Sequence, residues 1–291
     1  MTAPAQALQD RACLVLHGPD QPGIVAAVAA LITRNNGNIV SLDQCSDDAN
    51  GGAFFQRVVF HRPELSAVLP QIEDDLQATL TPFGMHWRLT DQSIPKRMAI
   101  LASTADHCVL ELLWRHRRGE LPVTVPMVIS NHTKIAADVR SFGVPFFHVP
   151  SRPEDKSASE TRILELVKGN VDFLVLARYM QIISDTFLDE ADVPIINIHH
   201  SFLPAFVGAA PYRRAKDRGV KLIGATSHYV TAELDEGPII EQDVARVTHA
   251  MSANDLQARG AYVERAVLSR AVGWHAEDRV IRHGNHTIVF A

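Results

Sequence analysis

The sequence predicts two mixed α/β units: a split β-α-β-β-α-β unit over residues 11–90 and a doubly wound, mostly parallel α/β domain over 98–291. Three observations support this division. Strand and helix patterns follow the β-α-β-β-α-β order up to residue 90, and they alternate again from residue 98. Between them, residues 91–97 are polar with one proline, as in an exposed linker. A length of 291 residues also favours two domains.

In the first unit, helices are predicted from apolar spacing and strands from apolar runs bounded by turn residues. The helix over 24–34 is rich in alanine, and Asn35, Asn36 and Gly37 form a plausible C-cap. The polar segment 47–52 between two strands predicts a hairpin turn. The predicted elements are strand 12–17, turn 18–23, helix 24–34, strands 38–45 and 54–60, helix 65–80 and strand 85–89. This order is that of the ferredoxin-like split βαβ unit.

In the second domain, apolar strands alternate with amphipathic helices, which predicts βαβ units and a Rossmann-like parallel sheet. Pro126 lies inside a predicted strand and requires an edge position or a bulge. Ser252 is a plausible N-cap of the last helix. The predicted strands are 98–103, 123–130, 144–149, 172–176, a strand from 195, a strand from 222, and 238–244; the predicted helices are 106–118, 133–142, 159–168 and 252–271; a hairpin covers 280–290.

Charge and hydropathy exclude several classes of partner. The chain has 28 Lys and Arg residues and 33 Asp and Glu residues, which gives a formal net charge of −5. This charge does not favour nucleic acid as a binding partner. No apolar run approaches the ~20 residues that span a bilayer, so no membrane segment is expected. Residues 1–10 lack a basic region followed by an apolar one, so no signal peptide is predicted. We therefore expect a cytoplasmic protein.

Metal and disulfide chemistry are not predicted. Cys13, Cys45 and Cys108 are odd in number and far apart, which indicates reduced, mostly buried thiols. The chain has 14 histidines but no His-Glu-x-x-His motif. The adjacent His199 and His200 would face opposite sides of a continuing strand. We expect no metal site.

The stretch over residues 195–208 carries the strongest chemical pattern. Asn197 and His199 lie two apart on a short apolar strand, so both project from the same face. The carboxyl end of such a strand is where open α/β sheets place their ligand crevice, and an amide beside an imidazole suits a carbonyl group. Asp235, on a later acidic turn, can reach the imidazole and hold it charged. The alternative is that both are ordinary hydrogen-bonded turn residues.

Four spaced motifs add a resemblance. Asn197-Ile-His199, Ser201-Phe-Leu-Pro-Ala-Phe206, Gly224-Ala-Thr-Ser-His228 and Leu234-Asp-Glu-Gly-Pro-Ile-Ile240 resemble the folate-dependent formyltransferase family. The resemblance implies a catalytic trio of Asn197, His199 and Asp235. That family usually has proline after the catalytic histidine, whereas His200 here resembles the formyltetrahydrofolate deformylase branch.

The first unit resembles an ACT domain through Gly18-Pro-Asp-Gln-Pro-Gly-Ile24 and Gly37-Asn-Ile39. Such domains commonly bind amino acids between paired copies, so the resemblance implies a homo-oligomer, a dimer or a tetramer, and glycine or methionine as effector. Backbone amides at the start of the helix after Gly23 can hold a carboxylate. The alternative is a unit that only builds a dimer interface. The implied effector residues are Asp20, Gln21, Pro22, Gly23, Ile24 and Asn38.

The same resemblance implies how the folate substrate is held. Residues 174–183 resemble the family's hinge segment, which grips the pterin, and residues 230–234 would close over its other edge. His228 would support the site by hydrogen bonding. Gln181 and Ala210 depart from the residues usual at these positions, which affects the outer part of the substrate. The implied substrate-binding residues are Arg178, Met180, Gln181, Ile182, Ile183, Val230, Leu234 and His228.

The first strand-to-helix turn of the second domain indicates the acceptor. Ser103-Thr-Ala-Asp-His-Cys108 has no glycine, and Asp106 would repel a phosphate, so water is the simplest acceptor. The resemblance then implies hydrolysis of 10-formyltetrahydrofolate to formate and tetrahydrofolate without a permanently bound cofactor, supplying formate for purine synthesis and balancing the one-carbon folate pool. Two alternatives stay open: a formyltransferase with a small non-phosphorylated acceptor, and a non-catalytic amino-acid sensor.

Overall fold

The computed structural model describes residues 8–48, 51–151, 155–204 and 211–291 and divides the chain into two compact units. Unit 1 contains the residues up to Pro95 together with Glu277–His283 and Ile288–Ala291. Unit 2 contains Lys96–Ala276 and Gly284–Thr287. The boundary between Pro95 and Lys96 falls inside the predicted linker, whereas most of the C-terminal hairpin groups with unit 1 instead of the predicted second domain.

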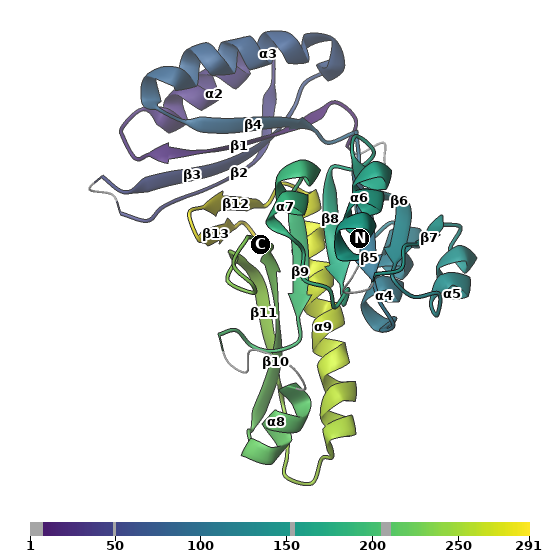
Figure 1. Cartoon of the computed structure of the whole chain (residues 1–291). Helices are drawn as coiled ribbons and strands as arrows, with labels where there is room; N and C mark the ends of the chain where they lie inside the picture. Colours follow the sequence, from purple (N-terminus) through teal and green to yellow (C-terminus); the bar gives the residue numbers. More distant parts are fainter. Residues whose placement is uncertain (1–7, 49–50, 152–154, 205–210) are drawn as a thin grey trace. The chain divides into compact units, whose positions relative to one another are not determined.

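Unit 1 is an antiparallel sheet of order β2-β3-β1-β4 with helices α2 and α3 on one face (Figure 1). Its elements are β1 (Arg11–Pro19), α2 (Ile24–Arg34), β2 (Asn38–Ser46), β3 (Ala53–His61), α3 (Leu65–Leu80), the 3₁₀ turn η1 (Thr81–Phe83) and β4 (His86–Asp91). The spacing of apolar residues predicted the bounds of α2 and α3 correctly.

The central strand β1 is buried on both faces because its side chains alternate between two cores. Ala12, Leu14 and Leu16 pack toward the helices. Cys13 and Val15 pack with Phe55 and Val59 of β3 and with Ile281, Ile288 and Phe290 from the end of the chain. The C-terminal segment therefore supplies the second apolar layer of unit 1.

Unit 2 is built on a seven-stranded sheet of order β11-β10-β9-β8-β5-β6-β7. The five strands from β9 to β7 in this order are parallel, and β10 and β11 extend the sheet antiparallel. The strands are β5 (Lys96–Ala102), β6 (Val123–Ser130), β7 (Phe146–His148), β8 (Phe173–Ala177), β9 (Ile195–His199), β10 (Leu222–Tyr229) and β11 (Ile239–Arg246). The chain reverses direction across the sheet between β5 and β8, the switch point at which α/β folds bind ligands.

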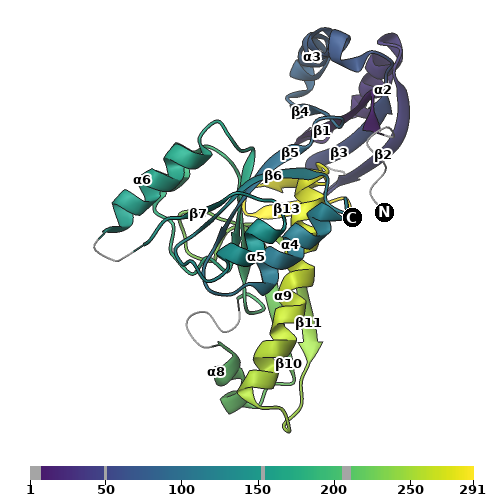
Figure 2. The same cartoon turned by 90° about the vertical axis from the view of Figure 1, so that its right-hand side faces the viewer.

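Helices cover both faces of this sheet. Figure 2 shows α6 on the opposite side of the sheet from α4, α5 and α9. The long α9 packs along β10 and β11, with α8 against it. The helices are α4 (His107–Arg117), α5 (Ala136–Ser141), α6 (Lys156–Val167), α7 (Asp185–Ala191), α8 (Pro211–Arg218) and α9 (Ala253–Ala276); the terminal hairpin is β12 (Val280–His283) and β13 (His286–Val289).

Some local details of the elements agree with the sequence prediction and others differ from it. The sheet accommodates Pro126 at a register shift between β5 and β6, as expected. Ser252 caps α9, accepting from the amide of Asp255. Helices α7 and α8 were not predicted, although Ser184 caps α7 by accepting from the amide of Phe187. Cys45 is exposed, so only Cys13 and Cys108 are buried as expected. None of the helices in the described ranges is long and apolar enough to cross a membrane.

Candidate active site

A pocket of about 460 Å³ lies beyond the carboxyl ends of β8 and β9 in unit 2. Its walls come from the end of β8, from β9, and from the connection between β10 and β11. All the catalytic and substrate-binding residues predicted from sequence line it: Asn197, His199, Asp235, Arg178, Met180, Gln181, Ile182, Ile183, Val230, Leu234 and His228. Ile198 and His200 also line the pocket, and the sequence interpretation had not assigned either of them to it.

His199 is the last residue of β9 and is 7% exposed. Its Nδ1 lies 3.2 Å from Oδ2 of Asp235, so the ring donates to the carboxylate from this nitrogen. Its Nε2 is buried and has no hydrogen-bond partner among the described residues. A buried polar atom left unpaired beside a pocket is a position at which a ligand can complete the hydrogen bonding.

Asn197 is held by its cross-strand neighbour. The antiparallel register of β9 and β10 places His228 directly opposite Asn197. His228 donates from Nδ1 to the carbonyl of Tyr229 at 2.9 Å, so its Nε2 can accept from Nδ2 of Asn197 at 3.2 Å. The amide nitrogen has two hydrogens, and one therefore stays available to the pocket. His228 is 2% exposed, which fits the supporting part predicted for it.

Asp235 joins the two histidines. Its Oδ1 lies 3.6 Å from Nε2 of His228, while Oδ2 contacts His199. Burial alone would raise the pKa of Asp235, but the hydrogen bond from His199 holds it well below its ordinary value. The carboxylate is therefore ionised at neutral pH and accepts the hydrogen bond from Nδ1 of His199.

The backbone around the pocket is strained at three residues that are not glycine. Arg178, Met180 and Asp235 have φ of 62°, 61° and 59°, in the left-handed region. Such strain clusters where surrounding structure fixes a functional side chain. Gly237 then lies so close to the carbonyl oxygen of Tyr229 that any Cβ would collide with it. The turn that positions Asp235 therefore requires glycine at this position.

The mouth of the pocket is apolar. Met180, Ile182 and Leu234 are 61%, 61% and 58% exposed, so none of the three is a core residue. Large exposed apolar side chains around a concave site favour a flat or apolar ligand. Gln181, in the same segment, accepts from the hydroxyl of Ser151 at 3.3 Å. Ala210 lies outside the described residues.

The comparisons with known proteins agree with this geometry. The ACT domain model matches residues 14–77 and the Formyl transferase model residues 96–272. A formyltetrahydrofolate deformylase from Mycobacterium bovis is 58% identical over 95% of this chain and 90% of its own, and one from Bacillus subtilis is 46% identical over 97% and 94%. The crystal structure of a formyltetrahydrofolate deformylase from Pseudomonas syringae has a TM-score of 0.91 and 43% identity, covering 97% of this chain and 94% of that one.

The chain belongs to the formyltetrahydrofolate deformylase family. The predicted pairing of an ACT domain with a formyltransferase fold is confirmed. Membership of this family also supports the predicted hydrolase and does not favour the transferase alternative.

One expectation about this deformylase-family site was wrong. The strand was expected to continue past His199, which would send His200 to the other side. Instead, β9 ends at His199, and the chain bends at His200. Both imidazoles line the pocket, with ring centroids 5.2 Å apart. The alternation of side chains holds only while the extended backbone continues.

Behind the pocket, a buried carboxylate organises a polar network. Glu264 of α9 is 2% exposed and lies 3.5 Å from Nε of Arg178, which lines the pocket. It accepts from the hydroxyl of Tyr212 at 2.6 Å and contacts Nε2 of His107 at 2.8 Å. Burial would raise the pKa of Glu264, but His107 and Arg178 lower it to about 2. This network was absent from the sequence interpretation, because α4, α9 and the end of β8 are far apart in the chain.

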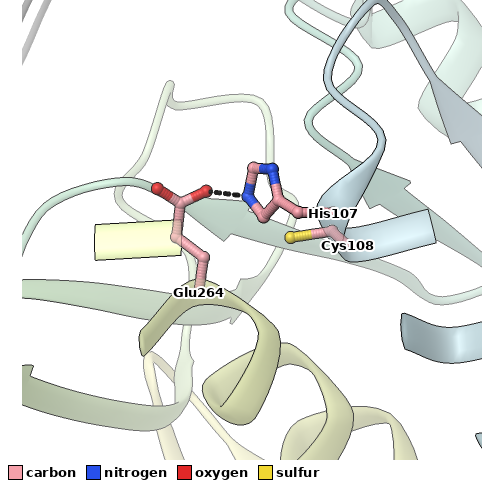
Figure 3. Close-up of side chains that lie close together, drawn as sticks. All are labelled: His107, Cys108 and Glu264. Carbon is pink, nitrogen blue, oxygen red and sulfur yellow. Dashed lines mark hydrogen bonds and ion pairs between the residues drawn. The ribbon is translucent and has the colours of Figure 1, made fainter. Parts of the chain in front are cut away.

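His107, Cys108 and Glu264 offer ligand atoms within 4.8 Å of one another (Figure 3). The carboxylate is already engaged by His107, Tyr212 and the Arg178 cation, and a guanidinium beside a site opposes binding of a second cation. Burial and the Glu264 charge also raise the pKa of the Cys108 thiol, which disfavours the thiolate that a metal requires. We assign these residues to the polar network behind the pocket.

The turn after β5 is closed by side chains. The hydroxyl of Ser103, which is 4% exposed, donates to Oδ1 of Asn131 at 2.6 Å and also contacts the carbonyl of Tyr179. Ser103 thereby ties the first strand-to-helix turn to the pocket segment after β8. The carboxylate of Asp106 makes no capping hydrogen bond at the start of α4. The negative charge of Asp106 beside the start of α4 disfavours a phosphate at this position.

Five of the six residues predicted to bind an effector lie at the start of α2 in unit 1, whereas Asn38 begins β2 at the opposite end of the sheet, where it pairs with His61. Gly23 is the N-cap, with φ of 101°, and no side chain caps the helix. Gln21 donates to the carbonyl of Phe83 at 2.8 Å, and the amide of Asp20 donates to the carbonyl of Gly52 at 2.8 Å. Ile24 is buried at 1% exposure, whereas Asn38 is exposed. Pro22 lies between Gln21 and Gly23 and is exposed.

Proposed function

We propose that this chain hydrolyses 10-formyltetrahydrofolate to formate and tetrahydrofolate at the pocket of unit 2. The observation that carries the proposal is the convergence of Asn197, His199 and Asp235 at one end of the pocket, with His199 Nε2 unpaired. Two donors beside one another suit the oxygen of a formyl group as it becomes an oxyanion. The relatives that are named formyltetrahydrofolate deformylases support the choice of substrate.

Each polar side chain has a distinct part in this reaction. Asn197 donates its second amide hydrogen to the formyl oxygen, and protonated His199 donates from Nε2. Each such donor is worth about 3 kcal/mol when it is directed at the developing charge. Asp235 keeps His199 protonated, and His228 fixes the orientation of the Asn197 amide.

The proton transfers of the proposed reaction return Asp235 and His199 to their starting protonation states. The water oxygen bonds to the formyl carbon while one of its protons passes to Asp235. The bond between carbon and N10 breaks as His199 gives its Nε2 proton to N10. Nδ1 of His199 keeps the hydrogen that it donates to Asp235. After the bond to N10 has broken, Asp235 releases the proton taken from water to solvent, and solvent reprotonates His199 at Nε2. Formic acid then loses its proton to solvent.

The apolar mouth fits the rest of the substrate. A pterin is flat, and Met180, Ile182 and Leu234 offer exposed apolar surface on two sides of the opening. Burying such surface contributes roughly 25 cal/mol per Å². The strained backbone at Arg178 and Met180 holds polar backbone groups near the ring edge. We therefore place the pterin against residues 178–183 and 230–234.

The test is formate release from 10-formyltetrahydrofolate by purified protein without an added amine. We expect turnover that is reduced at least about a hundredfold in Asn197→Ala, His199→Ala and Asp235→Ala. Asp189→Ala is the matched control, because Asp189 is an exposed carboxylate of α7 outside the pocket. Formate release that persists at the wild-type rate in all three variants would contradict the assignment, and release that requires an amine would favour the transferase.

For unit 1, we propose an amino-acid effector, glycine or methionine, at the start of α2, and a homo-oligomer built through this unit. The uncapped amides after Gly23 support a carboxylate there. An effector that acts through this position changes turnover in the wild type but not in Asp20→Ala. Sedimentation with and without effector measures the oligomeric state. An unchanged response of Asp20→Ala would place the effector elsewhere.

A further inference from the structure

His200 has a position in the pocket that the trio does not explain. It follows the last residue of β9 and lines the pocket beside Asn197 and His199. Its ring lies between two others, 5.2 Å from the ring of His199 and 6.2 Å from that of Tyr212. A line of side chains thus runs from the ion pair of Asp235 and His199, through His200, to Tyr212 and Glu264.

The surroundings of His200 keep its imidazole neutral. Burial lowers the pKa of His200 to about 4, and the nearby cations Arg178 and His199 act in the same direction. The hydroxyl of Tyr212 donates its one hydrogen to Glu264 at 2.6 Å, so it has none to give to the His200 ring. A neutral imidazole has one nitrogen that donates and one that accepts. At neutral pH the pocket therefore contains a hydrogen-bond acceptor next to the catalytic histidine.

The trio offers the attacking water one acceptor, the Asp235 carboxylate, because Asn197 and His199 act as donors to the formyl oxygen. Both carboxylate oxygens of Asp235 contact histidines. Within the described part of the chain, the ring nitrogens of His200 make no hydrogen bond. A water that attacks the formyl carbon must direct a lone pair at that carbon, so its two hydrogens need acceptors.

We propose that His200 binds and orients the attacking water. The acceptor nitrogen of His200 takes one hydrogen of the water, and Asp235 takes the other, so that the free lone pair faces the formyl carbon. The bond between the water oxygen and the formyl carbon forms as the hydrogen that Asp235 accepts moves to its carboxylate as a proton. The carbon–N10 bond breaks as His199 protonates N10. His200 itself neither gains nor loses a proton. Tyr212, held by Glu264, is the positioning residue that packs behind the His200 ring. This inference rests on the proposed deformylase function.

The experiment compares two nucleophiles. The purified wild-type protein and the His200→Gln variant are each incubated with 10-formyltetrahydrofolate at increasing concentrations of hydroxylamine. Formate and formylhydroxamate are measured in the same samples. Hydroxylamine is a neutral nucleophile that needs no water-binding residue. We expect His200→Gln to release formate at least about tenfold more slowly, with KM for the folate changed less than about threefold. Hydroxamate formation stays close to wild type, so the ratio of hydroxamate to formate rises about tenfold or more.

Further variants keep the test informative if one of them folds poorly. His200→Asn is a second variant, whose side-chain amide lies at about the level of the native Nδ1, whereas the amide of His200→Gln lies at about the level of Nε2. Far-UV circular dichroism verifies that each variant is folded. His249→Gln, at an exposed histidine outside the pocket, should match wild type in both products. The inference is overturned if folded His200 variants release formate at the wild-type rate, or if both products fall together at a constant ratio. A wild type that binds the folate but releases no formate contradicts the proposed function itself.

Discussion

At the scale of single residues, Asn197 shows how the sheet sets the chemistry. Its amide is fixed because the register of β9 and β10 places His228 opposite it, and His228 is in turn fixed by the carbonyl of Tyr229. One amide hydrogen is committed to this contact and the other is free for substrate. The arrangement is preorganised, so little reorganisation is needed when charge develops on the formyl oxygen.

We predict that Asn197→Ala lowers kcat about 10²- to 10³-fold while KM for the folate changes only a few-fold, because a donor to the transition state is lost and the apolar contacts remain. Steady-state formate release measures both constants. Asn170→Ala is the control, since Asn170 is exposed and its side chain bonds to the carbonyl of Leu166. If Asn197→Ala raised KM and left kcat unchanged, the amide would contribute to ground-state binding of the folate instead.

A second residue-scale prediction concerns His17 of β1. Burial lowers the pKa of His17 below 6.5, assisted by His86 and His283, while Phe55 stacks on the same ring. The folded-state pKa lies below the unfolded one, so unfolded chains take up this proton more readily. The contribution to stability is therefore complete above pH 6.5 and is lost as pH falls.

Urea unfolding of the wild type and of His17→Gln at about pH 7.5 and about pH 5.5 measures this effect. We expect the midpoint of the wild type to fall more on acidification than the midpoint of His17→Gln. His249→Gln, at an exposed site, should retain the wild-type dependence. Equal falls in wild type and His17→Gln would mean that other groups account for the acid sensitivity.

At the scale of elements, α9 links the pocket wall to the sheet. Glu264 projects from its buried face, and Gly260, one turn earlier, makes room for Tyr212, with which any Cβ at that position would collide. The helix thus accepts a glycine in its interior, which costs up to about 1 kcal/mol relative to alanine. The gain is the hydrogen bond between Tyr212 and the buried Glu264 carboxylate.

Two glycines of α9 provide a matched pair of substitutions. We predict that Gly260→Ala destabilises the protein by about 1–3 kcal/mol, because Tyr212 must move and Glu264 loses a buried partner. Gly273→Ala should be neutral or stabilising by up to about 1 kcal/mol, since its Cβ would meet Leu121 at an ordinary 3.6 Å. Urea midpoints of both variants decide this. Equal midpoints would show that Tyr212 can move without cost.

At the scale of the whole molecule, the end of the chain completes its beginning. Segments of the C-terminal hairpin cover the face of the unit 1 sheet that α2 and α3 leave open. Arg57 of β3, which is 5% exposed, donates to the carbonyls of Asp278 and Glu277, each at 3.0 Å. The ACT-domain unit is therefore not made of contiguous sequence.

Deletion of residues 277–291 should lower the melting temperature of unit 1, because it exposes the apolar layer around Phe55 and removes the two carbonyls that accept from the Arg57 guanidinium. Calorimetry, together with binding of an apolar dye, measures the change. Deletion of the exposed Ala291 alone is the control. Retention of the full-length melting temperature would mean that the first ninety-five residues fold independently of the hairpin.

The sequence by itself determined the two fold classes, the bounds of α2, α3 and β6, and the residues that meet in the pocket. These follow from local periodicity, from the rule that ligands bind at the carboxyl ends of parallel strands, and from motifs that lie on a few adjacent strands. Only the tertiary structure decided that His200 shares the pocket with His199, that Glu264 and His107 support it from distant helices, and that the C-terminal hairpin packs on unit 1. Each of these depends on where a strand ends or on contacts between residues far apart in the chain, and neither is encoded in the spacing of neighbouring residues.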